Sequence, residues 1–510
     1  MPFKALNNRE KEERSYIYSH TTKHLNFVVK SKRSQSALEY MMTYGWAILI
    51  IVIVAVILYS MGIFNPSSSV TFTSSGFSPF TVSSSLCNNL GYKIAVLAGP
   101  IPNNANSITI NKVFLTSATG ANTTTAGYTL TNPVTLKSGQ SATILIPNVA
   151  CTAAKVHYSF SAKIQYSYTA GTLGLQTVNT TGTIAGTSIS GKPSALTSYE
   201  PITITNTQSS ATPNPFQQMV NFTSSGNGWT SISTGNFGQN VEFFYYNGTI
   251  IPSWLENYTS TNAIWWLKIA AIPAGSSETV YVGFAPTTTN LFNTVNDGEA
   301  PQLSSTYAEY DDGANVFNYY ENFAGTSLPS DFTSYVGDAT LTVDNGLHIQ
   351  VANNGCSSTW AGVIYNNPIN AADSIVEAYS SGTTADGPTD VGIYTANSDT
   401  AGGYAGVADT WGWGWGTISG GYGNIGNPFD ISSGNGVASI YWIRNGDEGI
   451  GWNYNFVSST NTNEGWSSSL YASIQDGQCS PGANMEYYWF RVRSYPPNGV
   501  MPSVTFSSVA

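Results

Sequence analysis

The chain has 510 residues, a formal net charge of −11 and only 9% charged residues. Its length allows about three or four domains, each able to bury a core. Its abundance of Ser, Thr, Asn, Gly and Tyr favours β-strands joined by polar turns. The acidic balance argues against nucleic acid as a partner, because nucleic-acid-binding proteins present basic surfaces to phosphates.

The N-terminal part joins a basic segment to a long apolar run. Residues 1–34 hold eight Lys or Arg and three Glu, whereas the rest of the chain holds ten basic and 26 acidic residues. Residues 41–64 are 24 residues without a charge, and as a helix they would extend about 36 Å, enough for the ~30 Å core of a bilayer. The excess of Lys and Arg before the run predicts a single-pass membrane protein with residues 1–34 in the cytoplasm and the rest outside the cell.

Glu39 lies at the start of this apolar run and needs a partner of opposite charge. Desolvating its carboxylate would cost several kcal/mol without a nearby cation. Cleavage between Ser34 and Gln35 would place a new α-amino group four residues away, and the amines of neighbouring chains could lie closer still. The pattern therefore predicts that processing supplies the cation.

Basic residues and a small residue before the cut, then Gln35, Glu39 and an apolar helix, form a pattern that resembles the class III signal peptide of archaeal type IV pilin-like proteins. The resemblance implies a leader over 1–34, cut by a prepilin-type peptidase between Ser34 and Gln35. It implies a transmembrane or assembly helix over 35–64, with Glu39 setting the register between pilin-like subunits. The alternative is an uncleaved membrane anchor that does not assemble, with Glu39 reaching the interface.

The four cysteines fall two and two on either side of a long middle segment. We expect one disulfide between Cys87 and Cys151 and another between Cys356 and Cys479, as suits an extracellular protein. Free buried thiols are the alternative. No two cysteines are spaced closely enough for a zinc knuckle, so we expect no metal there.

Five Asn residues lie in acceptor patterns for N-glycosylation. In a chain rich in Asn and Thr such patterns also arise by chance, so the sequence permits these modifications without requiring them. The five residues are Asn122, Asn179, Asn221, Asn247 and Asn257.

Residues 65–191 contain short alternating runs bounded by Gly and Ser, for example 142–146 and 156–160. One face of the second run carries Val156, Tyr158 and Phe160. This pattern predicts a β-sandwich head domain. A stretch rich in Ser, Gly and Pro follows, and residues 192–198 are expected to be a linker.

Residues 199–319 are predicted to form a second β-sandwich. The strand 241–246 runs into Asn247-Gly248, a hairpin signal, and later runs read Ile-Pro-Ala-Gly-Ser-Ser and Val-Tyr-Val-Gly-Phe. This string, over about 202–296, resembles the domain of unknown function 2341, a module of secreted and surface proteins. We expect Trp254 in the core and Glu256 in solvent.

Residues 320–510 complete a mainly β chain. The entry segment from Tyr320 to Leu328 and the closing segments 487–493 and 502–506 resemble a concanavalin-like or laminin-G-like jelly roll. The whole fold class is then an N-terminal pilin-type or transmembrane α-helix followed by tandem β-sandwiches, the last one lectin-like.

The string from Thr410 to Gly416 alternates tryptophan with glycine. On a strand, Trp411, Trp413 and Trp415 would share one face, where their indole rings could stack on sugar rings. The alternative, which we favour, is that they face the core between the two sheets. They remain the candidate carbohydrate-binding residues.

Enzymatic chemistry finds little support in the sequence. A retaining glycosidase needs two carboxylates about 5 to 5.5 Å apart, and the spacing that would place them on one strand face is missing. Asp386 and Asp390 lie in a Gly/Pro-rich segment, where Ca²⁺ is conceivable but solvated carboxylates are favoured. We therefore expect no catalytic residues and no cofactor.

These patterns together predict a cell-surface adhesion protein that binds carbohydrate, displayed on a membrane-anchored or filament-forming helix. The competing interpretations are a surface glycoside hydrolase and a plain surface anchor.

Overall fold

The computed structural model describes residues 44–45, 48–53 and most of 72–510. The gaps within the last range are 123–126, 148, 152, 227, 337–338, 352–360, 371–372, 384–388, 395–403, 409–412, 419–420, 427–435, 443–447, 460–468 and 477–483. The chain divides into two compact units, 1–70 and 71–510.

In the first unit, the described residues 44–45 and 48–53 are helical and their side chains are exposed, with Ile51 66% accessible. Within the part of the chain that the structure describes, no helix has both the length and the apolar character needed to cross a membrane. Ser34, Gln35 and Glu39 lie outside the described residues.

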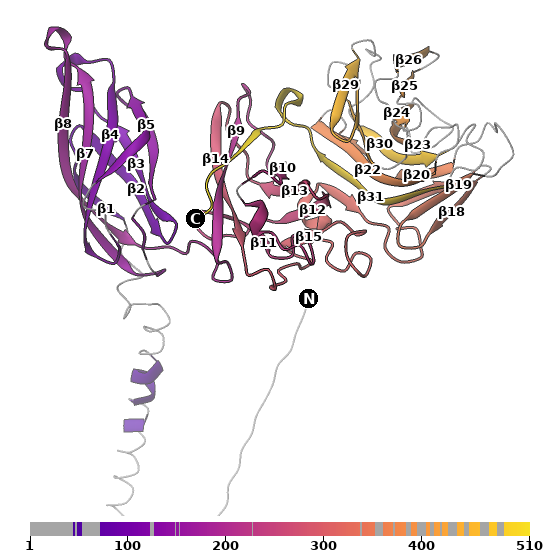
Figure 1. Cartoon of the computed structure of the whole chain (residues 1–510), viewed down its shortest axis with the longest axis horizontal. Helices are drawn as coiled ribbons and strands as arrows, with labels where there is room; N and C mark the ends of the chain where they lie inside the picture. The colour runs from indigo at the N-terminus through magenta and orange to yellow at the C-terminus, as the bar shows by residue number, and fades with distance from the viewer. Residues whose placement is uncertain are drawn as a thin grey trace, which may run out of the picture. The chain divides into compact units, whose positions relative to one another are not determined.

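The second unit begins with a β-sandwich, the first module, which covers residues 72–191 (Figure 1). Its strands alternate between buried and exposed positions, as period-2 patterning requires. In β7, for example, Tyr158, Phe160 and Ile164 enter the core between the sheets. One sheet has the order β1 (Thr73–Gly76), β8 (Leu175–Thr187), β7 (His157–Thr169), β4 (Ile108–Thr119), β5 (Tyr128–Leu136); the other has β2 (Phe80–Asn88), β3 (Gly91–Ala98), β6 (Ser141–Ile146).

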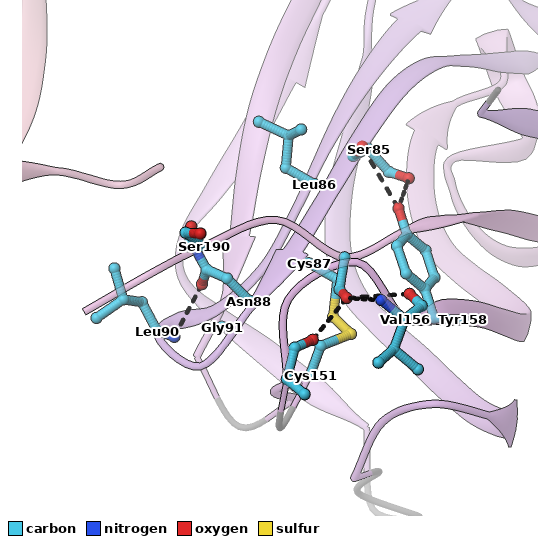
Figure 2. The surroundings of a disulfide bond; sticks show 12 residues. Ser85, Leu86, Cys87, Asn88, Leu90, Gly91, Cys151, Val156, Tyr158 and Ser190 are labelled. Atoms are coloured by element: carbon cyan, nitrogen blue, oxygen red, sulfur yellow. Dashed lines mark hydrogen bonds between the residues drawn. A yellow bond between two sulfur atoms is a disulfide. The ribbon is translucent and has the colours of Figure 1, made fainter. Parts of the chain in front are cut away.

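The expected disulfide between Cys87 and Cys151 is present at one end of this core, with its Cα atoms 5.6 Å apart. Figure 2 shows it beside a hydrogen bond of 2.8 Å between the hydroxyl groups of Ser85 and Tyr158. The disulfide joins the end of β2 to the loop between β6 and β7, so it fixes the crossover from one sheet to the other against β2.

The middle module, residues 198–319 with one strand from the C-terminus, is also built from two sheets. Its core lies between them and holds Phe222, Phe243 and Trp265. One sheet has the order β10 (Phe216–Thr223), β13 (Asn262–Ile269), β12 (Ser253–Tyr258), β15 (Asp297–Glu299); the other has β11 (Val241–Tyr245), β14 (Ser276–Phe284), β9 (Ser198–Asn206), β32 (Ser503–Phe506).

The turn predicted at Asn247-Gly248 forms, and Gly248 has a φ of +78° that suits glycine. The strands on either side do not form an extended hairpin. After one isolated bridge between Phe244 and Ile250, the chain crosses over and β12 enters the opposite sheet.

The segment 502–506, expected to close the last domain, instead completes the middle module. β32 pairs with β9 over residues 503–506, and the ring centroid of Phe506 lies 4.8 Å from that of Phe222. The alternating Val504 and Phe506 are half-buried against the middle core, and this burial explains why the chain returns there.

The last module, residues 319–494, is a sandwich of two large sheets (Figure 1). Its core, between the sheets, includes Val376, Phe490 and Val492. Sheet E has the order β18 (Ala339–Val343), β19 (Leu347–Val351), β31 (Asn484–Ser494), β22 (Ser374–Thr383), β27 (Gly436–Trp442), β28 (Glu448–Trp452), β29 (Asn455–Ser459), and β16 (Tyr319–Glu321) also pairs with β31.

The second sheet of this module, sheet F, carries the glycine-rich strands. Its order is β17 (Phe332–Tyr335), β20 (Ala361–Tyr365), β30 (Ser469–Asp476), β23 (Thr389–Tyr394), β24 (Tyr404–Ala408), β25 (Trp413–Ile418), β26 (Gly421–Gly426), and β21 (Ile369–Asn370) also pairs with β30.

The middle and last modules share a separate aromatic core. Trp254 and Trp266 of the middle module pack with Trp489 of sheet E, and Phe317, just after the short helix α2 (Gly313–Val316), lies among them. The outer face of sheet E is therefore covered in part by the middle module, and the candidate site lies at this junction.

Candidate functional site

Two arginines on β31 face the middle module. Phe490 and Val492 point into the last module's core, so the alternate residues Arg491 and Arg493 point the opposite way. β22 lies beside β31 with Glu377 directly opposite Arg491. Arg491 Nε donates to Glu377 Oε2 at 2.7 Å, and Arg493 Nη2 donates to Oε1 at 2.8 Å.

Glu256 on β12 supplies a second carboxylate from the middle module. Its Oε2 atom lies 2.8 Å from Arg491 Nη1 and accepts a hydrogen bond of 2.7 Å from Trp266 Nε1. The Tyr454 hydroxyl, in the turn between β28 and β29, also donates to Glu256 and accepts from Arg491 Nη2. The network thus joins four strands, β12, β13, β22 and β31, and the turn between β28 and β29.

Aromatic rings enclose the guanidinium of Arg491. Its Cζ atom lies between 4.4 and 5.6 Å from the ring centroids, a range in which a desolvated cation is attracted to the ring faces. The four rings are those of Trp254, Trp266, Phe317 and Trp489.

Burial and charge oppose each other at Glu377. Burial by itself would raise the pKa of its carboxyl, but the charges of Arg491 and Arg493 and their hydrogen bonds outweigh it and lower the pKa to about 2. Burial would likewise lower the pKa of Arg491, and the charge of Glu377 raises it above the usual value. Glu377 therefore stays ionised and is unsuited to donating a proton.

A cavity of about 350 Å³ opens beside this network. Glu256 and Tyr454 form one part of its wall, and Tyr379 and Asn453 form another. Asn453 is held by accepting a 2.9 Å hydrogen bond from the backbone N–H of Val437. The described residues of the lining are Glu256, Asn257, Ile264, Tyr379, Gly436, Val437, Asn453 and Tyr454.

The cavity combines flat aromatic rings with hydrogen-bonding side chains. Tyr379 and Tyr454 contribute aromatic surface, and the amides of Asn257 and Asn453 contribute hydrogen-bonding atoms. The Tyr454 hydroxyl is already held by Glu256 and Arg491. Among the described residues of the lining, only Glu256 carries a carboxylate. The arrangement suits binding of a small polyhydroxylated ligand, whereas hydrolysis through two carboxylates would need a second one.

Several of the site residues predicted from the sequence lie away from this cavity or outside the described residues. Trp413 and Trp415 are on β25 of sheet F, and Trp411 lies outside the described residues. β25 belongs to the opposite sheet from β31.

Cys356 and Cys479 lie outside the described residues, so their expected disulfide stays a prediction. The five candidate glycosylation residues are all exposed, and Asn257 also lines the cavity.

The structure does not bring the possible calcium ligands together within the residues that it describes. Asp386 lies outside them, and Asp390, expected in a turn, is on β23. Within the described part of the chain, no three His, Cys, Asp or Glu side chains are grouped as a metal site would need. The possible Ca²⁺ therefore stays a prediction.

The sequence interpretation was right about Trp254, which is fully buried, and wrong about Glu256. Glu256 is only 3% exposed because it balances the charge of Arg491. The useful signal was the run Trp489 to Arg493, in which two arginines alternate with apolar residues. Two cations on one face of a buried strand require buried anions elsewhere in the chain.

No family model matches the chain. It is similar to uncharacterized protein 562 of Sulfolobus islandicus rod-shaped virus 1, with 29% identity over 358 residues, 61% of this chain. The aligned part is 59% of that viral protein, so the chain spans less than two thirds of its length.

Two solved structures illustrate the structural likenesses. A putative beta-glucanase from Mycobacterium abscessus has a TM-score of 0.26 and 12% identity, covering 34% of this chain and 99% of its own. The carbohydrate-binding module CBM66 from Bacillus subtilis has a TM-score of 0.24 and 11% identity, covering 32% of this chain and 96% of its own. At such TM-scores the likenesses assign neither a family nor a ligand.

Proposed function

We propose that this is a cell-surface carbohydrate-binding protein whose N-terminal helix anchors it in a membrane or assembles it with pilin-like subunits. The observation that carries the proposal is the cavity at the junction of the middle and last modules. Its aromatic and amide side chains suit a sugar, whose C–H groups stack on rings and whose hydroxyl groups need paired donors and acceptors.

The proposal is for binding without turnover. Glu256 is held by Arg491, Trp266 and Tyr454, so its carboxylate is already engaged in the resting structure. The nearby Glu377 stays ionised and tied to two arginines. These contacts support a rigid binding wall rather than an acid and nucleophile pair.

The proposed role of the N-terminal helix in anchoring or assembly comes from the sequence, and one structural observation supports it. Apolar side chains from Ile48 to Ile53 are 48% to 66% exposed, and apolar surface of this kind needs lipid or another helix to cover it. Cleavage by a prepilin-type peptidase predicts a mature chain that begins at Gln35 in peptide mass spectrometry of material from native membranes. A mature chain that begins at Met1 would reduce the helix to an ordinary anchor.

Asn257→Ala provides the test of sugar binding. The change removes hydrogen-bonding atoms from an exposed wall residue of the cavity, and the loss of one or two hydrogen bonds should weaken binding by about 3- to 10-fold. Binding would be measured by calorimetry with a ligand chosen from a glycan array, using unglycosylated protein.

Asn221→Ala is the matched control, because Asn221 is also an exposed acceptor residue in the same sheet but does not line the cavity. It should leave the affinity unchanged. Equal affinities for the Asn257 variant and the unmodified chain would place sugar binding elsewhere, and silence of folded protein on the array would count against the proposed function itself.

A further inference from the structure

Charge is divided unequally among the three modules. Residues 72–191, the first module, contain five lysines and neither Asp nor Glu. Residues 192–510 contain 25 Asp or Glu and only five Lys or Arg. The first module is therefore a basic body in an acidic chain, and a second copy of the chain offers it a surface of opposite charge.

Lys93 shows how the two charges meet within one chain. It lies on β3 of the first module, and its Nζ atom is 4.3 Å from the ring centroid of Tyr246 in the middle module. Burial lowers the pKa of the Lys93 amine, and the charge of Glu278 on β14 opposes that change. The contact between the first and middle modules thus already uses a lysine of one and a carboxylate of the other, and four lysines of the first module remain.

Two of these four lysines share the outer face of the five-stranded sheet of the first module, which we call sheet A. Val113 of β4 and Ile164 of β7 point into the core, so the alternate residues Lys112 and Lys163 point outward. Lys163 is paired with Phe114, two residues after Lys112, so the lysines are neighbours on adjacent strands. Lys163 Nζ lies 4.1 Å from the ring centroid of Phe114, on the same face.

This outer face of sheet A has no partner within the part of the chain that the structure describes. Apart from the main core of the first module, the hydrophobic clusters include no residue of β4, β7 or β8. None of the described carboxylates forms an ion pair with Lys112 or Lys163. Neutral residues such as the exposed Ser161 and Thr181 surround the two lysines. The face therefore presents two ammonium groups that a surface of opposite charge would complement.

Carboxylates are concentrated where the middle and last modules meet. Burial raises the pKa of the Glu321 carboxyl, and the charges of Asp331 and Asp311 add to the increase. Burial likewise raises the pKa of Glu299, with a contribution from the charges of Glu309 and Asp311. These groups therefore lie near one another, and we call Glu309, Asp311, Glu321 and Asp331 the acidic face.

The acidic face is accessible and lacks a cation. Glu309 and Asp331 are exposed, and the other two residues are half-buried. No described Lys or Arg forms an ion pair with any of the four. Because carboxylates held close together repel one another, a basic partner would relieve this repulsion.

We propose that the outer face of sheet A in one chain docks on the acidic face of a second copy of the chain. The two surfaces are different, so the contact is head-to-tail and leaves one surface of each kind open to further copies. The inference goes beyond the proposed sugar binding and does not depend on it. It gives the outer modules a contact of their own, separate from any contact of the N-terminal helix.

The test measures energy transfer between donor-labelled and acceptor-labelled copies of the full chain in detergent. Raising the NaCl concentration from about 50 to about 500 mM should weaken association about 10-fold, because salt screens exposed charges. Lys112→Glu/Lys163→Glu reverses the charge of the basic face, and Glu309→Lys/Asp331→Lys reverses that of the acidic face. Each double variant should weaken self-association about 10-fold.

Mixing the two double variants tests whether these surfaces meet each other. The lysine variant keeps the native acidic face and the acidic-face variant keeps the native basic face, so the mixture should recover the affinity of the unmodified chain to within about 2-fold. Recovery also shows that both variants are folded. Lys137→Glu/Lys155→Glu is the matched control, because it makes the same charge change at two exposed lysines outside the strands of sheet A. This control should leave association unchanged.

Three results would overturn the docking. Association that neither salt nor the double variants weaken would belong to the helix alone. The absence of recovery in the mixture would show that the two surfaces do not meet. If the copies do not associate and the unmodified chain binds phosphatidylglycerol vesicles more tightly than the lysine variant does, the basic face has a lipid partner instead.

Sugar binding has its own readout. Calorimetry on the same variants should give the sugar affinity of the unmodified chain, because neither double variant changes a residue that lines the cavity beside Tyr454. Failure of the docking therefore leaves the proposed function standing. A chain that binds no sugar but associates as described would lose the proposed function and keep the docking surface.

Discussion

At the scale of residues, the stability of the junction between the middle and last modules depends on which buried groups are charged and which are protonated. Around Arg491 and Glu377 the charges are paired, and Glu377 stays ionised to about pH 2. Around β15 and α2 the carboxyl groups of Asp297 and Asp312 are buried near the half-buried Asp311. The cluster around Glu377 therefore loses stability as the pH falls, whereas the aspartate cluster loses stability as the pH rises.

The acidic cluster gives a prediction for pH. Burial, followed by the charges of Asp311 and Asp297, raises the pKa of Asp312 from 3.8 to about 9. The folded chain therefore holds this proton more tightly than the unfolded chain. Its contribution to stability is complete below about pH 4 and is lost as the pH rises through 9, with a slope of up to about 1.4 kcal/mol per pH unit.

Asp312→Asn should remove this contribution while keeping the shape of a side chain that lies tightly over Gly298. Urea unfolding at pH 5 and pH 8.5 should show a smaller loss of stability in the variant than in the unmodified chain. Asp344→Asn, at an exposed acid of the last module, is the control and should leave the pH dependence unchanged. A variant as pH-dependent as the unmodified chain would contradict the assignment.

At the scale of elements, period-2 patterning predicted strands well but not their partners. Runs such as 142–146 and 241–246 became β6 and β11 within a residue of their predicted ends. Alternation determines which side chains face a core, and it carries no information on which strand lies beside which. The crossing of β12 into the opposite sheet and the return of β32 to β9 therefore could not be predicted.

The candidate site shows the same limit. In its most visible sequence feature, the Trp-Gly string, the residues from Trp413 onward lie on sheet F. The cavity is built from less conspicuous residues such as Glu256, Asn453 and Tyr454. These residues meet only because two modules pack together. The Arg491 and Arg493 pair was the local clue, since buried cations on one strand face require anions from a distant segment.

The disulfide of the first module gives a prediction for an element. Cys87 and Cys151 are 64 residues apart, and opening a loop of this length should lower the free energy of unfolding by about 4 kcal/mol in the chain-entropy model. Thermal unfolding of the Cys87→Ser/Cys151→Ser variant would measure the loss. Reductant should destabilise the first module of the unmodified chain and leave the first module of the variant unaffected. Equal stability of this module in the two chains would contradict the prediction.

At the scale of the whole molecule, the middle module depends on residues far away in sequence. Its edge strand β32 comes from residues 503–506, and its second aromatic face, with Trp254 and Trp266, is covered by Trp489 of the last module. The first module has its own main core and disulfide within residues 72–191, and it meets the middle module through a smaller cluster that includes Leu90 and Tyr246. The middle module therefore depends on the last module for its stability more than the first module does.

This inequality predicts the behaviour of fragments. A fragment of residues 198–319 would leave β9 without its β32 neighbour and would expose the tryptophans that pack against Trp489, so it should be unfolded or aggregate. A fragment of residues 198–510 keeps both contacts and should give the slow amide exchange of a folded core. The first module, 72–191, is the control and should fold alone when oxidised. The prediction would be wrong if the amides of 198–319 exchanged as slowly as those of 198–510. In that case the packing of Trp254 and Trp266 on Trp489 and the pairing of β32 with β9 would contribute little to stability. The middle and last modules would then be independent domains.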